Sequence, residues 1–177
     1  MTPSVPEYSQ PLLIVKLSGN ISVKNTDLIS IPFDVITYDP LGLWGVHVGM
    51  SGYVNHNYSE KIFTAPTDGT YLAILNVGIG PTTAINPYVT LDFWATGGQM
   101  YMQVRGSQVV NTTHSFSTIH RLQKDDVITP LFTHSDTANL TVGLGPEYTQ
   151  FQVIRLGPPP KVWDLSAYRY IKPLTKR

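Results

Sequence analysis

The residues best suited to chemistry in this sequence are five histidines and a few carboxylates in loops. The histidines are His47, His56, His114, His120 and His134. No two of them stand at a metal-ligand spacing such as H-x-H or H-E-x-x-H. Nucleophile-elbow, phosphate-loop and dinucleotide signatures are also missing, because the run Gly78-Ile79-Gly80 lacks the third glycine and the helix that should follow it. We therefore predict that the protein is not an enzyme and that it has neither catalytic residues nor a cofactor.

The loop carboxylates and one histidine could nevertheless bind an ion or respond to pH instead of having a purely structural role. Asp125, Asp126 and Asp136 are the oxygen ligands that calcium prefers, although local hydrogen bonding in turns explains them equally well. His120 lies in a predicted strand, and if it faced a symmetry axis its copies would meet there and respond to pH or hold an ion. The simpler interpretation of His120 is a hydrogen-bonded imidazole.

Composition and charge narrow the class of protein. Of the 177 residues, 42% are hydrophobic and 14% are charged, against about 25% charged in typical proteins. The formal net charge is zero and no basic arm is present, which argues against nucleic-acid binding. The chain has no cysteine, so no disulfide framework holds it. Enough apolar residues are present to build the core of one domain.

Neither a membrane span nor a secretion signal is evident. The opening residues, MTPSVPEYSQ, lack the basic and apolar regions of a signal peptide. Every apolar run is far shorter than a transmembrane helix requires. We expect a protein that is made without a signal peptide and that acts on the surface of a virion or another extracellular particle.

Short segments with strand signals follow one another along most of the chain, each closed by Gly, Pro, Asn or Asp. None of them shows a helical period. The spacing predicts an all-β jelly-roll β-sandwich of roughly nine to ten strands. The predicted strands are 12–17, 31–38, 71–79, 88–94, 100–104, 116–122, 127–133, 139–144 and 148–156.

The segment Tyr71–Ile79 is nearly continuous in apolar residues, as expected for a central strand that is covered on both faces. In an extended strand alternate side chains share a face. One face carries Tyr71, Ala73, Leu75 and Val77, and the other carries Leu72, Ile74 and Asn76.

The two ends of the chain differ in composition from the middle. Residues 1–11 hold three prolines and predict an extended arm, residues 12–156 form the jelly-roll domain, and residues 157–177 begin with three prolines after Gly157. This tail has five basic residues and one acid, together with Trp163, Tyr168 and Tyr170. Because aromatic side chains are uncommon in disordered tails, we predict that these three dock on a neighbouring subunit or on other assembly proteins. A solvated end is the alternative.

The motifs between residues 12 and 156 keep the order of a known pattern. They are Ile31-Pro32-Phe33-Asp34, Tyr38-Asp39-Pro40-Leu41-Gly42, Phe63-x-x-Pro66-x-x-Gly69-x-Tyr71, Leu122-x-x-Asp125-Asp126-Val127 and the final strand Phe151–Leu156. This order resembles that of the complement-type globular head domains, which share their jelly roll with the tumour necrosis factor-like superfamily. The sequence departs from that family in having Asp125 where glycine is usual, and in lacking a stalk and a secretion signal.

The resemblance implies a compact homotrimer in which one sheet of each subunit lies against the threefold axis. Candidates for the axis are Leu72, Ile74, Phe116, Thr118 and His120. A domain without disulfides gains stability when copies of itself cover its second apolar face.

Three functions fit these observations. The leading hypothesis is a non-enzymatic, trimeric structural or recognition protein of a virus or phage particle, as a capsid, decoration or fibre-head protein. The second is a soluble module whose loops bind a sugar or a cell-surface receptor through Trp44, Tyr53 and Tyr58. The third is a small capsid protein that assembles into closed shells by itself.

Overall fold

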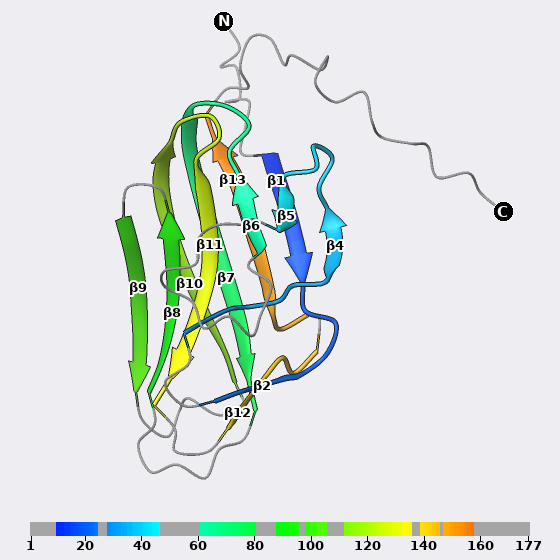
Figure 1. The fold of residues 1–177 in the computed structure, drawn as a ribbon, viewed down its shortest axis with the longest axis vertical. Helices are drawn as coiled ribbons and strands as arrows, with labels where there is room; N and C mark the ends of the chain where they lie inside the picture. Colours follow the sequence, from blue (N-terminus) through cyan, green and yellow to red (C-terminus); the bar gives the residue numbers. More distant parts are fainter. Residues whose placement is uncertain are drawn as a thin grey trace, which may run out of the picture.

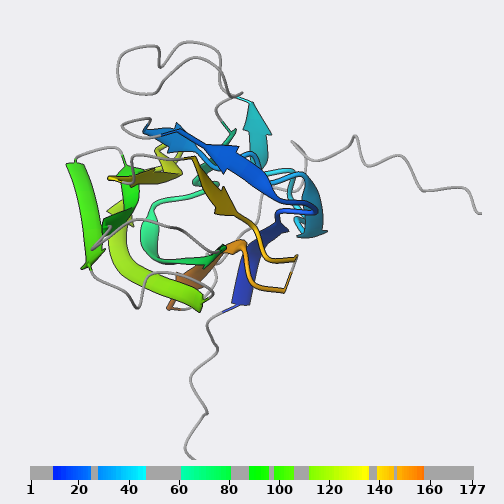
Figure 2. The same ribbon diagram turned by 90° about the horizontal axis from the view of Figure 1, so that it is seen from below.

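The alternation of apolar and polar residues that predicts strands appears directly as alternation of burial in the computed structural model of the chain. The structure describes residues 10–24, 28–46, 61–80, 88–95, 98–105, 112–135, 139–145 and 147–157. Within them thirteen strands form two antiparallel sheets that face each other across one core (Figure 1). Seen along the long axis, both sheets curve around that core (Figure 2). The predicted all-β jelly-roll sandwich is confirmed.

The larger sheet has seven strands. They are β1 (Gln10–Lys16), β2 (Ile21–Val23), β4 (Val35–Tyr38), β7 (Gly69–Ile79), β10 (Thr112–Leu122), β12 (Leu140–Val142) and β13 (Gln150–Leu156). Its main strands lie in the order β4-β1-β13-β7-β10, and each pairs antiparallel with its neighbours. The first and last long strands of the domain, β1 and β13, therefore lie side by side.

The smaller sheet has six strands. They are β3 (Ile29–Ser30), β5 (Trp44–Val46), β6 (Lys61–Thr64), β8 (Tyr88–Ala95), β9 (Gly98–Arg105) and β11 (Val127–His134). Their order is β5-β6-β11-β8-β9, with β3 also paired to β11. No helix among the described residues is long and apolar enough to cross a membrane.

The expected single strand 31–38 is instead a crossing between the two sheets. β3 ends in the smaller sheet at Ser30, and β4 begins in the larger sheet at Val35. Pro32 interrupts the strand because it has no N–H to donate, while Phe33 is fully buried in the core. Asp34 accepts a hydrogen bond from the backbone N–H of Ser18 at 2.7 Å. Burial alone would raise the pKa of Asp34, but its hydrogen bonds with Ser18 outweigh burial and lower it.

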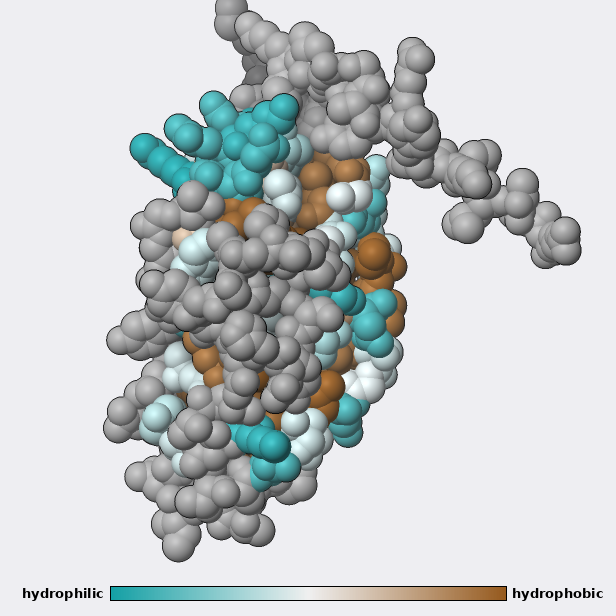
Figure 3. All heavy atoms as spheres, in the orientation of Figure 1, coloured by the Kyte–Doolittle hydropathy of each residue, from teal (hydrophilic) through white to brown (hydrophobic). Residues whose placement is uncertain are grey.

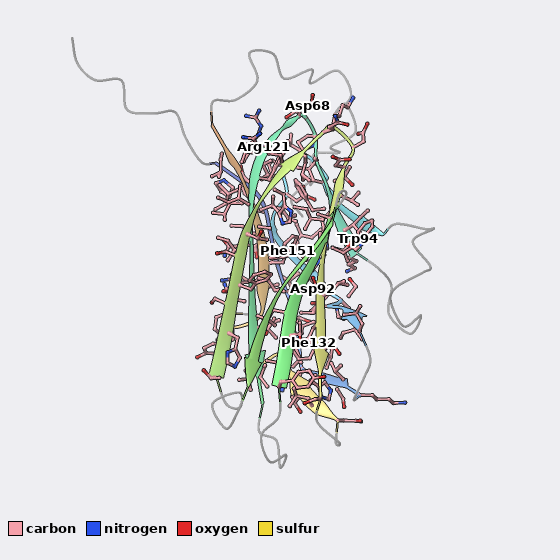
Figure 4. All side chains as sticks on the ribbon, turned by 90° about the vertical axis from the view of Figure 1, so that its left-hand side faces the viewer. Asp68, Asp92, Trp94, Arg121, Phe132 and Phe151 are labelled. Carbon is pink, nitrogen blue, oxygen red and sulfur yellow. The ribbon has the colours of Figure 1, made fainter. Side chains whose placement is uncertain are left out.

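Aromatic side chains from both sheets meet in the middle of the core. The ring centroid of Phe151 lies 6.3 Å from that of Phe33, 5.6 Å from that of Trp44 and 5.9 Å from that of Phe93. Of these residues, Phe33, Phe93 and Phe151 are fully buried. Burying a side chain of this size contributes about 1.5–3 kcal/mol, and aromatic pairs add to it. Phe151 therefore links β13 to the opposite sheet (Figure 4).

Two of the sequence motifs meet at one end of the molecule. The backbone N–H of Ala65 donates to the carbonyl of Asp126, and the N–H of Asp125 donates to the carbonyl of Ala65, both at 2.8 Å. The backbone N–H of Lys124 donates to Asp68 Oδ1 at 2.8 Å. The turn before β7 and the turn before β11 therefore hold each other in place, which gives the order of these motifs a structural reason.

Asp125 occupies a left-handed backbone conformation, with φ at 70°. This conformation strains side chains with a Cβ and costs glycine nothing. We expect Asp125→Gly to raise the free energy of unfolding by about 0.5–1 kcal/mol, and Asp125→Ala to lower it by a similar amount because alanine has no polar group to support the turn. Urea denaturation of both variants and of the wild type measures these differences in the free energy of unfolding. Alanine as stable as glycine would contradict the assigned conformation.

Candidate subunit interface

The register of the larger sheet decides which side chains share its outer face, the face turned away from the core. Directly opposed residues of antiparallel strands point to the same side. Leu72 of β7 is opposite Ile119 of β10 on one side and Ile154 of β13 on the other. The core-facing neighbours of Leu72 in β7, Tyr71 and Ala73, are fully buried, so Leu72 points outward. Ile154, Leu72 and Ile119 therefore form one row across three strands.

The next rows of the outer face are defined in the same way. Ile74 lies between Gln152 and Ser117, and Asn76 lies between Gln150 and Ser115. Ser115 Oγ donates a hydrogen bond to Asn76 Oδ1 at 2.6 Å. With Ile14 of β1, opposite Gln152, the central rows of the outer face comprise Ile14, Leu72, Ile74, Asn76, Ser115, Ser117, Ile119, Gln150, Gln152 and Ile154.

The central rows of this outer face carry no charged residue, although every member is exposed or half-buried in the single chain. Lys16, opposite Gln150, and Arg121, opposite Thr70, lie on the same face at its two ends. Soluble proteins usually place many charged side chains on their surfaces. Ile119 is 57% exposed, the highest value of any large hydrophobic residue that the structure describes. An uncharged surface with an aliphatic row and a band of amides and hydroxyls is typical of a contact between protein subunits.

The five axis candidates from the sequence do not lie together. Leu72 and Ile74 are on the outer face. Phe116, Thr118 and His120 are opposite Leu75, Ala73 and Tyr71, so they are on the inner face of β10. Phe116 stacks on Phe93 with ring centroids 5.2 Å apart, which places it on the core side of the sheet. On the outer face of β10 their places are taken by Ser115, Ser117 and Ile119.

His120 is buried on the inner face of β10 rather than exposed on the outer face. It is 8% exposed, and its ring is nearly perpendicular to that of Phe93, with centroids 6.1 Å apart. Its Nε2 atom has no hydrogen-bond partner. Burial lowers the pKa of His120 because it penalises the imidazolium form.

The lowered pKa of His120 predicts a pH dependence of stability. The unfolded chain binds a proton on this imidazole near pH 6.5, whereas the folded chain binds it only at lower pH. Stability should therefore fall as the pH drops below about 6.5 and level off below the folded pKa. Thermal melts between pH 8 and pH 5 of the wild type and of His120→Leu measure this contribution. Identical pH profiles for the two proteins would contradict it.

The other candidate residues are distributed as follows. Trp44 is 9% exposed and packs against Phe33 and Phe151, so its ring is not available to stack on a ligand. Asp126 accepts a hydrogen bond from the backbone of Gln123, as expected in a turn. The described residues contain no group of three side chains that could hold a metal ion. Tyr53, Tyr58, Asp136, Trp163, Tyr168 and Tyr170 lie outside the described residues.

Comparison of the sequence with known protein families and with curated proteins finds no match. Comparison of the fold with solved structures finds several matches. The crystal structure of murine APRIL at pH 8.5 superposes with a TM-score of 0.54 and 14% sequence identity, over 82% of this chain and 98% of the other. The vertex protein P5 of PRD1 superposes with a TM-score of 0.53 and 10% identity, over 85% and 99% of the two chains.

The fold is a tumour necrosis factor-like jelly roll. The resemblance first suggested by the order of short motifs is thus confirmed at the level of the fold. The globular domain of zebrafish complement 1qA also matches, with a TM-score of 0.49, 11% identity and coverage of 81% and 95%. Proteins with the tumour necrosis factor-like fold are typically non-enzymatic.

Proposed function

We propose that the protein is a non-enzymatic homotrimer in which the outer face of the larger sheet lies against the threefold axis. The observation that carries this proposal is the uncharged centre of the outer face, with Leu72, Ile119 and Ile154 in one row. Proteins with the tumour necrosis factor-like fold usually form homotrimers. Three copies would remove the aliphatic row from water, which is the main favourable contribution to such an association.

We further propose that the trimer is a structural component of a virus or phage particle, exposed at its surface. One of the structures that superpose above a TM-score of 0.5 is named as a vertex protein. The absence of cysteine and the low content of charged residues suit a robust assembly protein that needs no oxidising compartment. The buried position of Trp44 removes one of the three residues expected to bind a ligand at the loops, which weakens the alternative of a sugar-binding module.

Electron microscopy of the purified protein separates the proposed trimeric component from the alternatives. Isolated three-lobed particles support it. Closed uniform shells would instead indicate a capsid protein that assembles alone, and particles of single-subunit size would contradict the trimer. Labelling of intact virions with an antibody against the protein then tests the surface location, because a buried or absent epitope would contradict it.

A further inference from the structure

A second apolar surface lies at the edge of the larger sheet, on β4. Val35 is 39% exposed, Ile36 is 56% exposed and Tyr38 is 42% exposed. They are three of the five large hydrophobic residues that the structure describes as exposed. In Figure 3 this region shows as hydrophobic spheres on the right-hand side of the molecule, where Figure 1 places β4.

β4 is also an unpaired edge of the sheet. It pairs with β1 on one side, and no other strand that the structure describes pairs with the backbone donors and acceptors of its second side. Exposed edges are usually protected by charged residues, proline or a covering segment. The sequence Val-Ile-Thr-Tyr has no charge and no proline, and the register shift between Ile14 and Val15 is its one protective feature. An edge of this kind is suited to accept a further strand.

We propose that β4 is the docking site for the chain's own C-terminal segment, residues 161–172, which adds as a further antiparallel strand. Prolines cannot donate to a sheet ladder, and these twelve residues are the stretch without proline between Pro160 and Pro173. They include Trp163, Tyr168, Tyr170 and Ile171, which favour strands and offer apolar side chains to Val35, Ile36 and Tyr38.

The end of β13 places this segment within reach of β4. The chain leaves β13 at Leu156, and Gly157 has a φ of 97°, a conformation that turns the chain out of the strand. From β13 the free side of β4 is three strand spacings away, about 14 Å. Residues 157–162 can span about 20 Å when extended. A strand that returns from this end of the sheet runs antiparallel to β4, because β4 runs toward the same end as β13.

The absence of cysteine allows a direct test by disulfide trapping in the full chain. Tyr38→Cys and Val35→Cys are each combined with one cysteine at residue 163, 165, 168 or 170 and oxidised at low protein concentration. Antiparallel docking predicts that Tyr38→Cys links to earlier tail positions than Val35→Cys does, and that the links lie within one chain. Thr113→Cys, exposed on β10 at the opposite edge, is the matched control and should not link to the tail.

Each other pattern of linkage overturns the proposal. Links between chains would show that a neighbouring copy supplies the strand. Dimers formed by Tyr38→Cys alone would show that two β4 edges pair with each other. Equal linkage to β4 and to Thr113→Cys would show an undocked tail. None of these outcomes depends on the trimer, whose mass is measured separately.

A second measurement avoids cysteine substitutions. Hydrogen exchange of the full chain should show protection of amides in residues 35–38 and in part of residues 161–172. The full-length variant Tyr168→Pro/Tyr170→Pro should lose at least about tenfold of that protection in both segments, because proline removes ladder donors. Unchanged exchange of residues 35–38 in this variant would overturn the docking.

Discussion

Replacing Phe151 by alanine is expected to lower the free energy of unfolding by about 3–5 kcal/mol. The ring of Phe151 contacts Phe33, Trp44 and Phe93, so its loss leaves a cavity between the two sheets. Domains are usually stable by only about 5–15 kcal/mol. Phe151→Ala should therefore unfold at a much lower urea concentration than the wild type, and a large share of the variant should be insoluble on expression.

Two matched variants show whether the loss comes from the cavity. Phe151→Leu keeps most of the volume and should cost about 1–1.5 kcal/mol. Gln123→Ala, at an exposed turn position, should change the free energy of unfolding by less than about 0.5 kcal/mol. If Phe151→Ala were as stable as Gln123→Ala, the aromatic cluster would not be the centre of the core.

Replacing Ile119 by lysine is expected to dissociate the trimer while leaving the subunit folded. Ile119 is 57% exposed in the single chain, so a lysine there meets water and costs the monomer little. In the proposed trimer the lysine would be buried near two copies of itself, and an unpaired buried charge costs about 3–5 kcal/mol. Association should weaken by at least about a hundredfold for each subunit.

Circular dichroism and sedimentation separate these two effects. The spectrum of Ile119→Lys should match that of the wild type, and its mass should be that of one chain. Thr118→Lys is not a suitable control because Thr118 lies on the inner face, whereas Gln123→Lys adds the same charge to an exposed turn. A trimer that survives Ile119→Lys would place the subunit contact on another surface.

The alternation within long segments predicted much of the fold. In β8 every second residue is apolar, and the structure buries Val89, Leu91 and Phe93. The apolar run of β7 is nearly continuous, and there the structure fully buries the face with Tyr71, Ala73, Leu75 and Val77. The turn before β7 could be predicted from the sequence because Phe63, Gly69 and Tyr71 each have a specific structural role there. Tyr71, for example, donates its hydroxyl hydrogen to the carbonyl of Thr67 at 2.5 Å.

The outer face was harder to predict because its assignment depends on register. In β10 polar and apolar residues occur on both faces, with Phe116 on one and Ile119 on the other. A change of one residue in the pairing register exchanges these faces, and the residues of β10 alone do not determine that register. The face of β10 with Phe116, Thr118 and His120 was expected at the axis, whereas the structure stacks Phe116 on Phe93. The pairing of β7 with β13, which brings Ile154 to the row, joins segments too distant for sequence patterns to connect.

Short strands escaped prediction for a related reason. β2, β3, β5 and β6 have between two and four residues each, too few for alternation to show a period. Trp44 was expected to offer an exposed stacking surface to a ligand at the loops. Its burial follows from contacts with Phe33 and Phe151, which lie far from it in sequence.

Sedimentation equilibrium of the wild-type protein at micromolar concentration tests the central claim most directly. If the outer face of the larger sheet is buried between three copies, the mass is three times the 19.6 kDa of the chain, and the Ile119→Lys variant returns it to 19.6 kDa. A wild-type protein that sediments as a single chain would contradict the account.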